Sequence, residues 1–352
     1  MKLNNVYAKQ PYLFKQKKAD QENEMLATDI LQQLGYDQIE KVEFVDSTRD
    51  YDLFDVSMNQ QTYQFKYSFD CDSPFFSHEY NILKQLAPFC PQGIKHGIIK
   101  YGDKIQYLLT SHENAENIIQ FGVSTIFEYL ESFYYSFRQL SNVKTDRNFS
   151  QYLDSFFARN DIDNLPEHSI EAIKDHSNIN NLREILNTLK SEITFMSRQS
   201  FIKNTDFCHG NLLPQNILTK GGLFKFQNLH DGYMGNKFFD LCSLFVNIGI
   251  PLEYQRQIAI DFSKKYFDES EENLIIEYNS CYNLILRLFV YESIFSYLAE
   301  VYLYENSRPE KILQMVDVFL RNEEALMNIP SVEKHKSFLI RDVMEPLLGS
   351  RK

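Results

Sequence analysis

The sequence predicts an α+β protein in which a strand-rich N-terminal part precedes a helical C-terminal part. Three runs within residues 39–67 alternate apolar and polar side chains, as half-buried strands do. From residue 115 onward, apolar residues recur three to four positions apart, which is the spacing of amphipathic helices. A turn-rich stretch over residues 207–245 interrupts the helical pattern and reads as loop, strand, turn, strand and loop.

The N-terminal part is expected to span residues 1–112. Residues 1–20 are basic and are expected to form an irregular arm, and Gly35 is a natural stop for the first helix. The predicted elements are a helix at Asp20–Gly35, strands at Ile39–Val45, Tyr51–Met58 and Gln61–Tyr67, a helix at Phe76–Leu86, and strands at Gly97–Lys100 and Lys104–Thr110.

The C-terminal part is expected to span residues 113–352. Residues 160–180 are polar and irregular, which predicts a surface insertion. The predicted helices are Ser124–Leu140, Ser150–Ala158, Asn181–Met196, Pro251–Phe267, Glu271–Tyr304, Pro309–Met327 and Val332–Leu348.

Composition excludes several classes of function. The 352 residues carry a formal net charge of −12. Because binding to a nucleic-acid backbone needs a basic face, this charge argues against a nucleic-acid-binding protein. The five cysteines are widely spaced and lack a CxxC pair, so buried free thiols in a reducing compartment are expected. No apolar run reaches signal-peptide or membrane-spanning length, and a cytoplasmic protein is therefore expected.

The central stretch resembles a known family at five positions, His209, Gly210, Asn216, Asp240 and Leu241. The first loop reads His209-Gly210-Asn211 and continues to Asn216, and the pair Asp240-Leu241 follows twelve residues after Asn228. This order resembles the aminoglycoside phosphotransferase and choline kinase family, in which the loop reads His-Gly-Asp-(four residues)-Asn. The resemblance implies a bilobal protein-kinase-like fold with a catalytic-type loop over residues 207–245.

Two departures from the family pattern concern the chemistry. The family's catalytic Asp stands at Asn211 here, and its metal-holding Asp stands at Asn228. An amide keeps the size of the carboxylate but not its negative charge or its proton-accepting oxygen. ATP and Mg²⁺ are therefore possible cofactors whose binding is predicted to be weak, with Asn216 and Asn228 as the remaining metal-site residues.

The resemblance also assigns residues to a nucleotide site in the N-terminal lobe. Lys66 and Glu79 match the lysine that contacts phosphates and the helix glutamate that holds it. The glycine-free turn that contains Ser47 matches the phosphate-covering loop, and Leu109 and Ser111 match the linker that meets adenine. The alternative to this nucleotide-site role is that Lys66 and Glu79 are ordinary solvated residues, on a strand edge and on a helix surface.

Other loop residues are expected to act structurally. The resemblance implies that His209 packs under the metal-binding segment and that Asp240 braces the loop. His230 and Asp231 follow Asn228 and are alternative metal ligands if the site is rearranged.

Three functions remain open from the sequence. The first is a pseudokinase with weak or no phosphotransfer, which binds a small-molecule, protein or peptide ligand in the inter-lobe cleft. The second is an active ATP-dependent phosphotransferase that acts on a small-molecule or peptide hydroxyl through a rearranged metal site. The third is an unrelated α+β protein.

Overall fold

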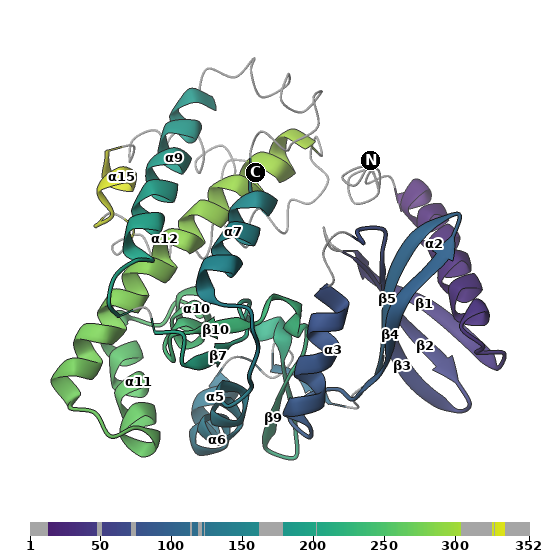
Figure 1. The fold of residues 1–352 in the computed structure, drawn as a ribbon, viewed down its shortest axis with the longest axis horizontal. Coiled ribbons are helices and arrows are strands. Elements are labelled where there is room, and N and C mark those ends of the chain that lie inside the picture. Colours follow the sequence, from purple (N-terminus) through teal and green to yellow (C-terminus); the bar gives the residue numbers. More distant parts are fainter. Residues whose placement is uncertain are drawn as a thin grey trace. The chain divides into compact units, whose positions relative to one another are not determined.

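The computed structural model of the chain contains two compact units (Figure 1). It describes residues 13–47, 51–71, 75–112, 115–118, 122, 124–161, 179–201, 203–303, 326 and 328–334. The first unit comprises residues 1–144 and 215–232, and the second comprises residues 145–214 and 233–352. The hairpin that follows the central loop, within residues 215–232, therefore belongs to the first unit. The predicted lobe boundary at residue 112 stays a prediction.

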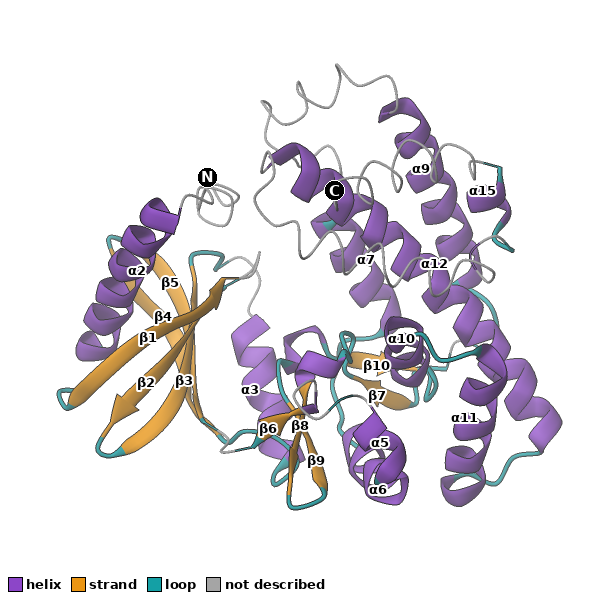
Figure 2. Cartoon of the chain, turned by 180° about the vertical axis from the view of Figure 1, so that it is seen from behind, coloured by secondary structure: helices purple, strands orange, loops and turns teal. Residues whose placement is uncertain are grey.

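The first unit is built on a five-stranded antiparallel sheet in the order β1-β2-β3-β5-β4. Figure 2 shows α2 lying along this sheet. The elements of the unit are α2 (Leu13–Gln33), β1 (Ile39–Ser47), β2 (Asp52–Met58), β3 (Gln61–Ser68), α3 (Phe75–Leu86), β4 (Gly93–Tyr101), β5 (Asp103–Ser111), β6 (Glu116–Asn117), α5 (Ser124–Glu128), α6 (Leu130–Ser141), β8 (Ile217–Lys220), β9 (Leu223–Phe226) and the short 3-10 helix η3 (Leu229–Asp231).

The hairpin of β8 and β9 closes on two glycines. Gly221 and Gly222 have φ values of 57° and 78°, which L-residues with a Cβ rarely adopt. Positive φ at both central residues matches the twist of the flanking strands, as two-residue hairpin turns require. β6 pairs with β8 and completes a three-stranded sheet.

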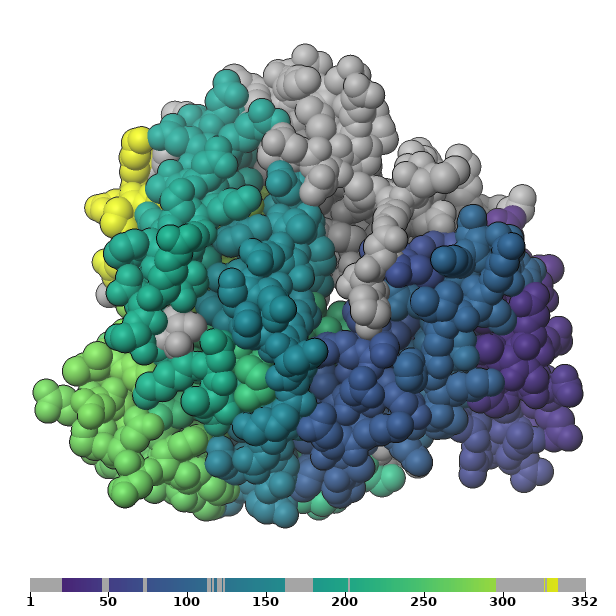
Figure 3. Space-filling view, viewed as in Figure 1, coloured from purple at the N-terminus to yellow at the C-terminus, as the bar shows by residue number. Residues whose placement is uncertain are grey.

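The second unit is mainly helical. In the space-filling view, the surfaces of α7 and α9 adjoin on the face turned to the viewer (Figure 3). Its elements are α7 (Phe149–Arg159), α9 (Ile179–Met196), β7 (Asp206–Cys208), β10 (Tyr233–Gly235), α10 (Phe239–Ile248), α11 (Leu252–Tyr266), α12 (Glu271–Leu303) and α15 (Pro330–Glu333), and the 3-10 turn η2 (Pro214–Asn216) spans the junction of the two units. β7, which directly precedes the central loop, pairs antiparallel with β10.

Three predicted segments differ from the structure. The first helix begins at Leu13 and not at Asp20, because residues 13–19 are helix formers without Gly or Pro. Residues 116–117 form β6 and not helix, since they pair with β8. The predicted helix Ser124–Leu140 is interrupted at Tyr129, whose φ of −119° and ψ of 40° leave the helical region.

Some predictions lie outside the described residues. These are the helix at 309–327 except residue 326, the helix at 332–348 beyond residue 334, and the insertion at 160–180 over residues 162–178. None of the five cysteines, all of which the structure describes, forms a disulfide, but Cys71 is only half-buried, unlike the expectation of buried thiols. Among the described helices, none combines the length and apolar character that a membrane crossing needs.

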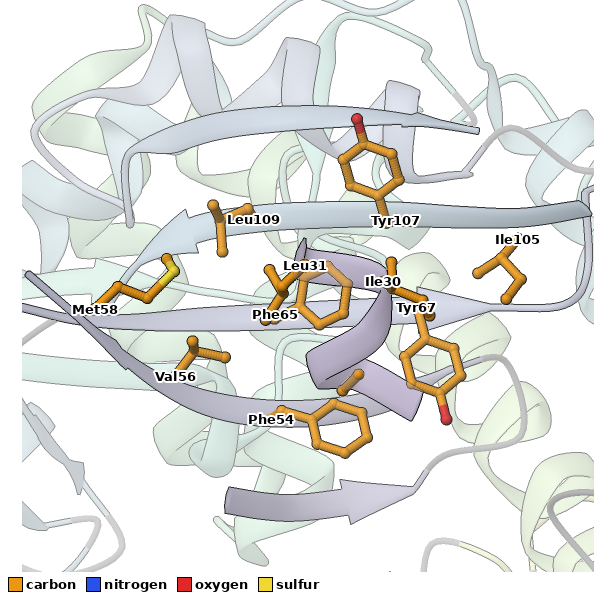
Figure 4. Packing of buried hydrophobic residues seen from close by; sticks show 11 residues of the cluster. Ile30, Leu31, Phe54, Val56, Met58, Phe65, Tyr67, Ile105, Tyr107 and Leu109 are labelled. Carbon is orange, nitrogen blue, oxygen red and sulfur yellow. The ribbon is translucent and has the colours of Figure 1, made fainter. Parts of the chain in front are cut away.

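The core of the first unit lies between α2 and the sheet. Figure 4 shows Ile30 and Leu31 of α2 over the aromatic side chains of β2 and β3. Phe54 is fully buried, and its ring lies 5.4 Å from the ring of Tyr67 and 5.7 Å from that of Phe44. Burial of such a ring stabilises the fold by both transfer from water and close packing.

Replacing Phe54 with Ala is expected to lower the free energy of unfolding by about 3–5 kcal/mol, because it leaves a cavity in the core of the first unit. Chemical denaturation checks this. The matched control is Phe195→Ala, since the Phe195 side chain is 68% exposed and should change stability by about 0.5 kcal/mol or less. Equal losses for the two variants would contradict the assignment of the core.

Candidate functional site

A buried ion pair lies on the face of the sheet opposite α2. Lys66 alternates with the core residues of β3 and therefore points away from α2. Its Nζ donates to Glu79 Oε1 at 2.9 Å and to Oε2 at 3.2 Å. The side chains are 4% and 2% exposed, so the alternative of two solvated surface residues does not hold. This bond also places α3, which carries Glu79, on the side of the sheet opposite α2.

Two asparagine amides continue this polar cluster. The third donor of Lys66 reaches Asn228 Oδ1 at 2.9 Å, which completes the donor capacity of an ammonium. Asn228 Nδ2 in turn donates to Asn216 Oδ1 at 2.8 Å. The resulting chain runs from Glu79 through Lys66 and Asn228 to Asn216.

The backbone around Asn228 explains how these groups meet. Asn228 follows the hairpin with φ 62° and ψ 53°, a left-handed conformation in which Asn and Asp are enriched. This residue precedes η3, and the next backbone N–H, of Leu229, donates to Glu79 Oε1 at 3.1 Å. The hairpin, α3 and β3 are therefore joined at one carboxylate.

The electrostatics of the cluster favour an ionised Glu79. Burial alone would raise its pKa, but attraction to the Lys66 ammonium and to His230, with hydrogen bonds from Lys66 and Leu229, outweighs burial and holds the pKa below its ordinary value. With Lys66 positive, Glu79 negative and both asparagines neutral, the four side chains carry no net charge.

The arrangement does not fit a magnesium ion. Mg²⁺ is usually held by one or two carboxylates together with phosphate oxygens. Here Asn228 directs its oxygen to Lys66 and its NH₂ group to the oxygen of Asn216, so both amide oxygens already accept hydrogen bonds. Among the described residues, no group of three or more His, Cys, Asp and Glu side chains could hold a metal.

Of the three other predicted nucleotide-site residues, Leu109 and Ser111 have side chains that the structure describes, and both make contacts elsewhere. Leu109 pairs with Phe65 on β3 and belongs to the core beneath α2. Ser111 Oγ accepts from the backbone N–H of Gln92 at 2.8 Å. Ser47 ends β1 opposite Asp52, and its side chain lies outside the described part.

Sequence reasoning missed Tyr51, which lies beside the cluster. Its hydroxyl donates to Asn228 Oδ1 at 3.4 Å, and its ring centroid lies 5.0 Å from Lys66 Nζ. His230 packs edge-on against the Tyr51 ring, and its Nε2 lies 3.5 Å from an Asp231 oxygen. Tyr51 is the first residue of a predicted strand, where an aromatic residue is ordinary, so no sequence signal separates it from core tyrosines.

In the second unit, Asp240 organises the predicted catalytic-type loop. Its carboxylate accepts from the backbone N–H of His209 at 2.6 Å and from that of Gly210 at 3.2 Å. His209 is fully buried, and its Nδ1 accepts from the backbone N–H of Asn211 at 3.3 Å. These bonds fix the loop through its backbone and leave the Asn211 side chain to line a cavity.

That cavity has a volume of about 220 Å³ and lies wholly within the second unit. Tyr152 and Tyr233 stack at its wall with ring centroids 4.3 Å apart, and the Tyr152 hydroxyl donates to Gly210 O at 3.1 Å. Its polar lining includes Asn211, Ser243 and Asn247. The cavity therefore combines flat apolar walls with a few directed polar groups, as small-molecule sites do.

The stability of the second unit is expected to depend on pH through Asp240. Burial raises the pKa of Asp240 to about 7 from an ordinary 3.8, although the two backbone bonds act in the opposite direction. The unfolded chain releases this proton near pH 4 and the folded chain near pH 7, so stability should fall as pH rises between these values and level off above. Denaturation from pH 4 to 8 should show a shallower slope for Asp240→Asn but an unchanged slope for Asp103→Asn at an exposed position.

Removing one partner of the buried pair is expected to cost more than removing both. Lys66→Met leaves Glu79 buried without its counter-charge and should lower the free energy of unfolding by about 3–5 kcal/mol. The double change Lys66→Met with Glu79→Leu removes both charges and should restore most of that loss. Urea denaturation measures both. Lys264→Met, which breaks an exposed pair with Glu271, should cost less than about 1 kcal/mol. A double variant as unstable as the single one would contradict this interpretation.

The fold has matches among solved structures. A thermostable mutant of aminoglycoside phosphotransferase APH(4)-Ia in its apo form shares 11% identity with a TM-score of 0.56, covering 85% of this chain and 97% of that one. Amicoumacin kinase hAmiN, solved with AMP-PNP, Ca²⁺ and Ami, shares 11% identity with a TM-score of 0.55, covering 76% and 86%.

Choline kinase LicA from Streptococcus pneumoniae shares 11% identity with a TM-score of 0.53, covering 85% of this chain and 99% of that one. Neither a protein-family model nor a curated protein sequence matches this chain. At such low identity the likeness concerns the fold, and it agrees with the resemblance carried by His209, Gly210, Asn216 and Asp240. The chain therefore has the protein-kinase-like fold of the aminoglycoside phosphotransferases and choline kinases.

Proposed function

We propose that this protein is a kinase-fold binding protein with weak or no phosphotransfer. The observation that carries the proposal is the position of Asn228 between Lys66 and Asn216. Its amide connects the two by hydrogen bonds at the place where the family resemblance puts a metal-holding carboxylate. A cation there would have to displace the NH₂ group of Asn228 without gaining a negative charge.

The size of this effect follows from electrostatics. One carboxylate about 4 Å from a unit charge contributes about 4 kcal/mol at an effective dielectric constant near 20. Its absence weakens the binding of a metal–nucleotide complex by orders of magnitude, because each 1.4 kcal/mol corresponds to about a factor of ten. The neutral cluster of Lys66, Glu79, Asn216 and Asn228 supplies no compensating charge.

The loop of the second unit supports the same function. Asn211 stands where the resemblance puts the catalytic Asp, and an amide cannot take the proton of a substrate hydroxyl. Loss of a positioned base typically lowers a rate by about 10² to 10⁴. Asp240 still holds His209 and Gly210, so the loop keeps its shape without its base.

Binding can persist where transfer is lost. The cavity of 220 Å³ beside Asn211 offers stacked aromatic rings and several amide and hydroxyl groups to a small molecule. Solved structures of similar fold hold hygromycin B, spectinomycin or Ami. We infer a small-molecule ligand in this cavity. We also propose a cytoplasmic protein, because cysteines that form no disulfide suit a reducing compartment.

One observation favours an active phosphotransferase as a second candidate. Lys66 and Glu79 form the pair that kinase-like enzymes use to hold phosphates. Asp231 and His230 lie beside this pair and are the nearby groups that a rearranged metal site would use. This candidate requires magnesium to bind through them and not through Asn228.

Thermal unfolding with ATP, with and without Mg²⁺, separates the two candidates. The natural protein is expected to show little Mg²⁺-dependent shift in melting temperature, and Asn211→Asp combined with Asn228→Asp is expected to show a larger one. The gain arises because a carboxylate at position 228 would restore a negative charge to the cluster. Asn283→Asp, an equal change at an exposed position of α12, serves as the control and should behave like the natural protein.

A strong Mg²⁺-dependent shift in the natural protein, together with ATP consumption that Lys66→Ala abolishes, would overturn the proposal. It would establish the phosphotransferase. If Asp231→Asn then removed the metal dependence, the rearranged site would be identified.

A further inference from the structure

Strand β4 is an open edge of the sheet in the first unit. The order β1-β2-β3-β5-β4 puts β1 and β4 at the two edges, and among the described residues β4 pairs with β5 alone. An edge strand turns every second set of backbone N–H and C=O groups away from its neighbour. Within the described ranges, no hydrogen bond reaches these outward groups of β4. They are therefore available to a further strand.

The opposite edge, β1, is better protected. Its ladder with β2 is irregular at two places, and the backbone N–H of Phe44 donates to Glu24 Oε1 of α2 at 2.9 Å. Irregular ladders and covered backbone groups are common ways in which proteins protect edge strands. The ladder of β4 with β5 shifts only near Gly93 and runs regularly from Lys95 to Tyr101. This regular part of β4 suits strand pairing.

The face of β4 on the side of α3 exposes an apolar side chain. The Tyr101 hydroxyl bonds to α2, whereas the His96 ring lies 4.3 Å from the ring of Tyr80 on α3. Because side chains alternate along a strand, Ile98 and Lys100 share the face of His96. Ile98 is 60% exposed. A large β-branched residue therefore stands uncovered in the middle of the open edge.

Cations adjoin this exposed isoleucine. Lys100 pairs across the ladder with Lys104, and both lysines are exposed. Like charges directly opposite each other on two strands destabilise a sheet. Among the described residues, neither lysine takes part in an ion pair. Lys84, in the last turn of α3, lies 4.3 Å from the centroid of the Tyr80 ring and adds a third cation near β4.

Charge selects the kind of strand that this edge accepts. The chain as a whole has a formal net charge of −12, so the lysines at β4 are a local exception. The nearby acid, Asp103, pairs with Tyr101 and therefore lies on the α2 side of the sheet. A second copy of β4 would bring further lysines to the edge and be repelled. A strand with an acid opposite Lys100 would instead relieve the repulsion between Lys100 and Lys104.

We propose that β4 is the docking edge for an extended acidic segment of another protein, which adds a sixth strand to the sheet. Antiparallel pairing, as in the rest of the sheet, places alternate side chains of the segment opposite Lys100, Ile98 and His96. An acid suits the first position, a β-branched apolar residue suits the second, and an acid suits the third because Lys84 is near. Backbone bonds supply affinity and the side chains supply selectivity.

A synthetic peptide of this pattern tests the proposal, acetyl-Trp-Glu-Thr-Val-Thr-Glu-Thr-Val-amide. Because the protein contains no tryptophan, the fluorescence anisotropy of the peptide reports binding without a protein background. The full chain should bind the peptide with a dissociation constant in the millimolar range or below. Replacing both glutamates of the peptide by glutamine should weaken binding about fivefold, the weight of two exposed ion pairs.

Methylation of peptide nitrogens tests the strand pairing itself. Methyl groups on alternate amides block hydrogen bonding along one edge of the peptide and leave the other edge free. Only one peptide edge faces β4, so one set of methyl groups should abolish binding and the other set should change it by less than about twofold. Loss of binding with both sets, or with neither, contradicts strand addition.

Charge variants locate the acids of the peptide. In Lys100→Gln with Lys104→Gln, the glutamate and glutamine peptides should bind alike, because the attraction at the edge is gone. The matched control is Lys264→Gln with Lys334→Gln, which changes two exposed lysines of the second unit and should keep the fivefold difference.

An apolar variant locates the strand. Ile98→Thr keeps the β-branched shape but removes apolar contact, and it should weaken binding about threefold. Val45→Thr makes a similar change at an exposed residue of β1, the opposite edge, and should leave binding unchanged.

The proposal is overturned if the natural protein does not bind the peptide at millimolar concentration, or if the glutamine peptide binds equally well. It is also overturned if the protein self-associates and Ile98→Thr abolishes that association, since the occupant would then be a second copy. Thermal melting checks that each variant is folded, and the methylated peptides decide the matter on the natural protein alone. The assay contains no nucleotide and leaves the Lys66 cluster intact, so its outcome is independent of the proposed function.

Discussion

The buried pair of Lys66 and Glu79 sets the main constraint on the first unit. Two charges removed from water stabilise a fold only when each finds its full set of partners. Lys66 meets this requirement with both oxygens of Glu79 and the amide oxygen of Asn228, and Glu79 also accepts from Leu229. Strand β3, helix α3 and the segment after the hairpin are therefore positioned by one set of hydrogen bonds.

The same requirement links stability to the proposed loss of chemistry. In the neutral cluster, the amide of Asn228 serves the buried lysine and connects it to Asn216. The loop of the second unit shows a similar separation, because Asp240 holds the backbone of His209 and Gly210 while Asn211 lines a cavity. Both places are held by buried hydrogen bonds, and both have an amide where the resemblance expects an acid.

Much of this arrangement follows from local patterns in the sequence. The alternation in β1 to β3 and the Gly221–Gly222 turn define the sheet and the hairpin, since period and turn chemistry are local properties. The contact of Tyr51 with Asn228 could not be predicted, because it joins residues distant in sequence through ordinary side chains.

The backbone at Asn228 bears on how the protein can evolve. A backbone position with a left-handed φ of 62° accommodates Asn, Asp or Gly far more readily than a residue with a branched side chain. Codons for Asn and Asp differ by a single base, so one point mutation exchanges amide for acid there without rebuilding the turn. The present state of this position is thus one base change away from its charged counterpart.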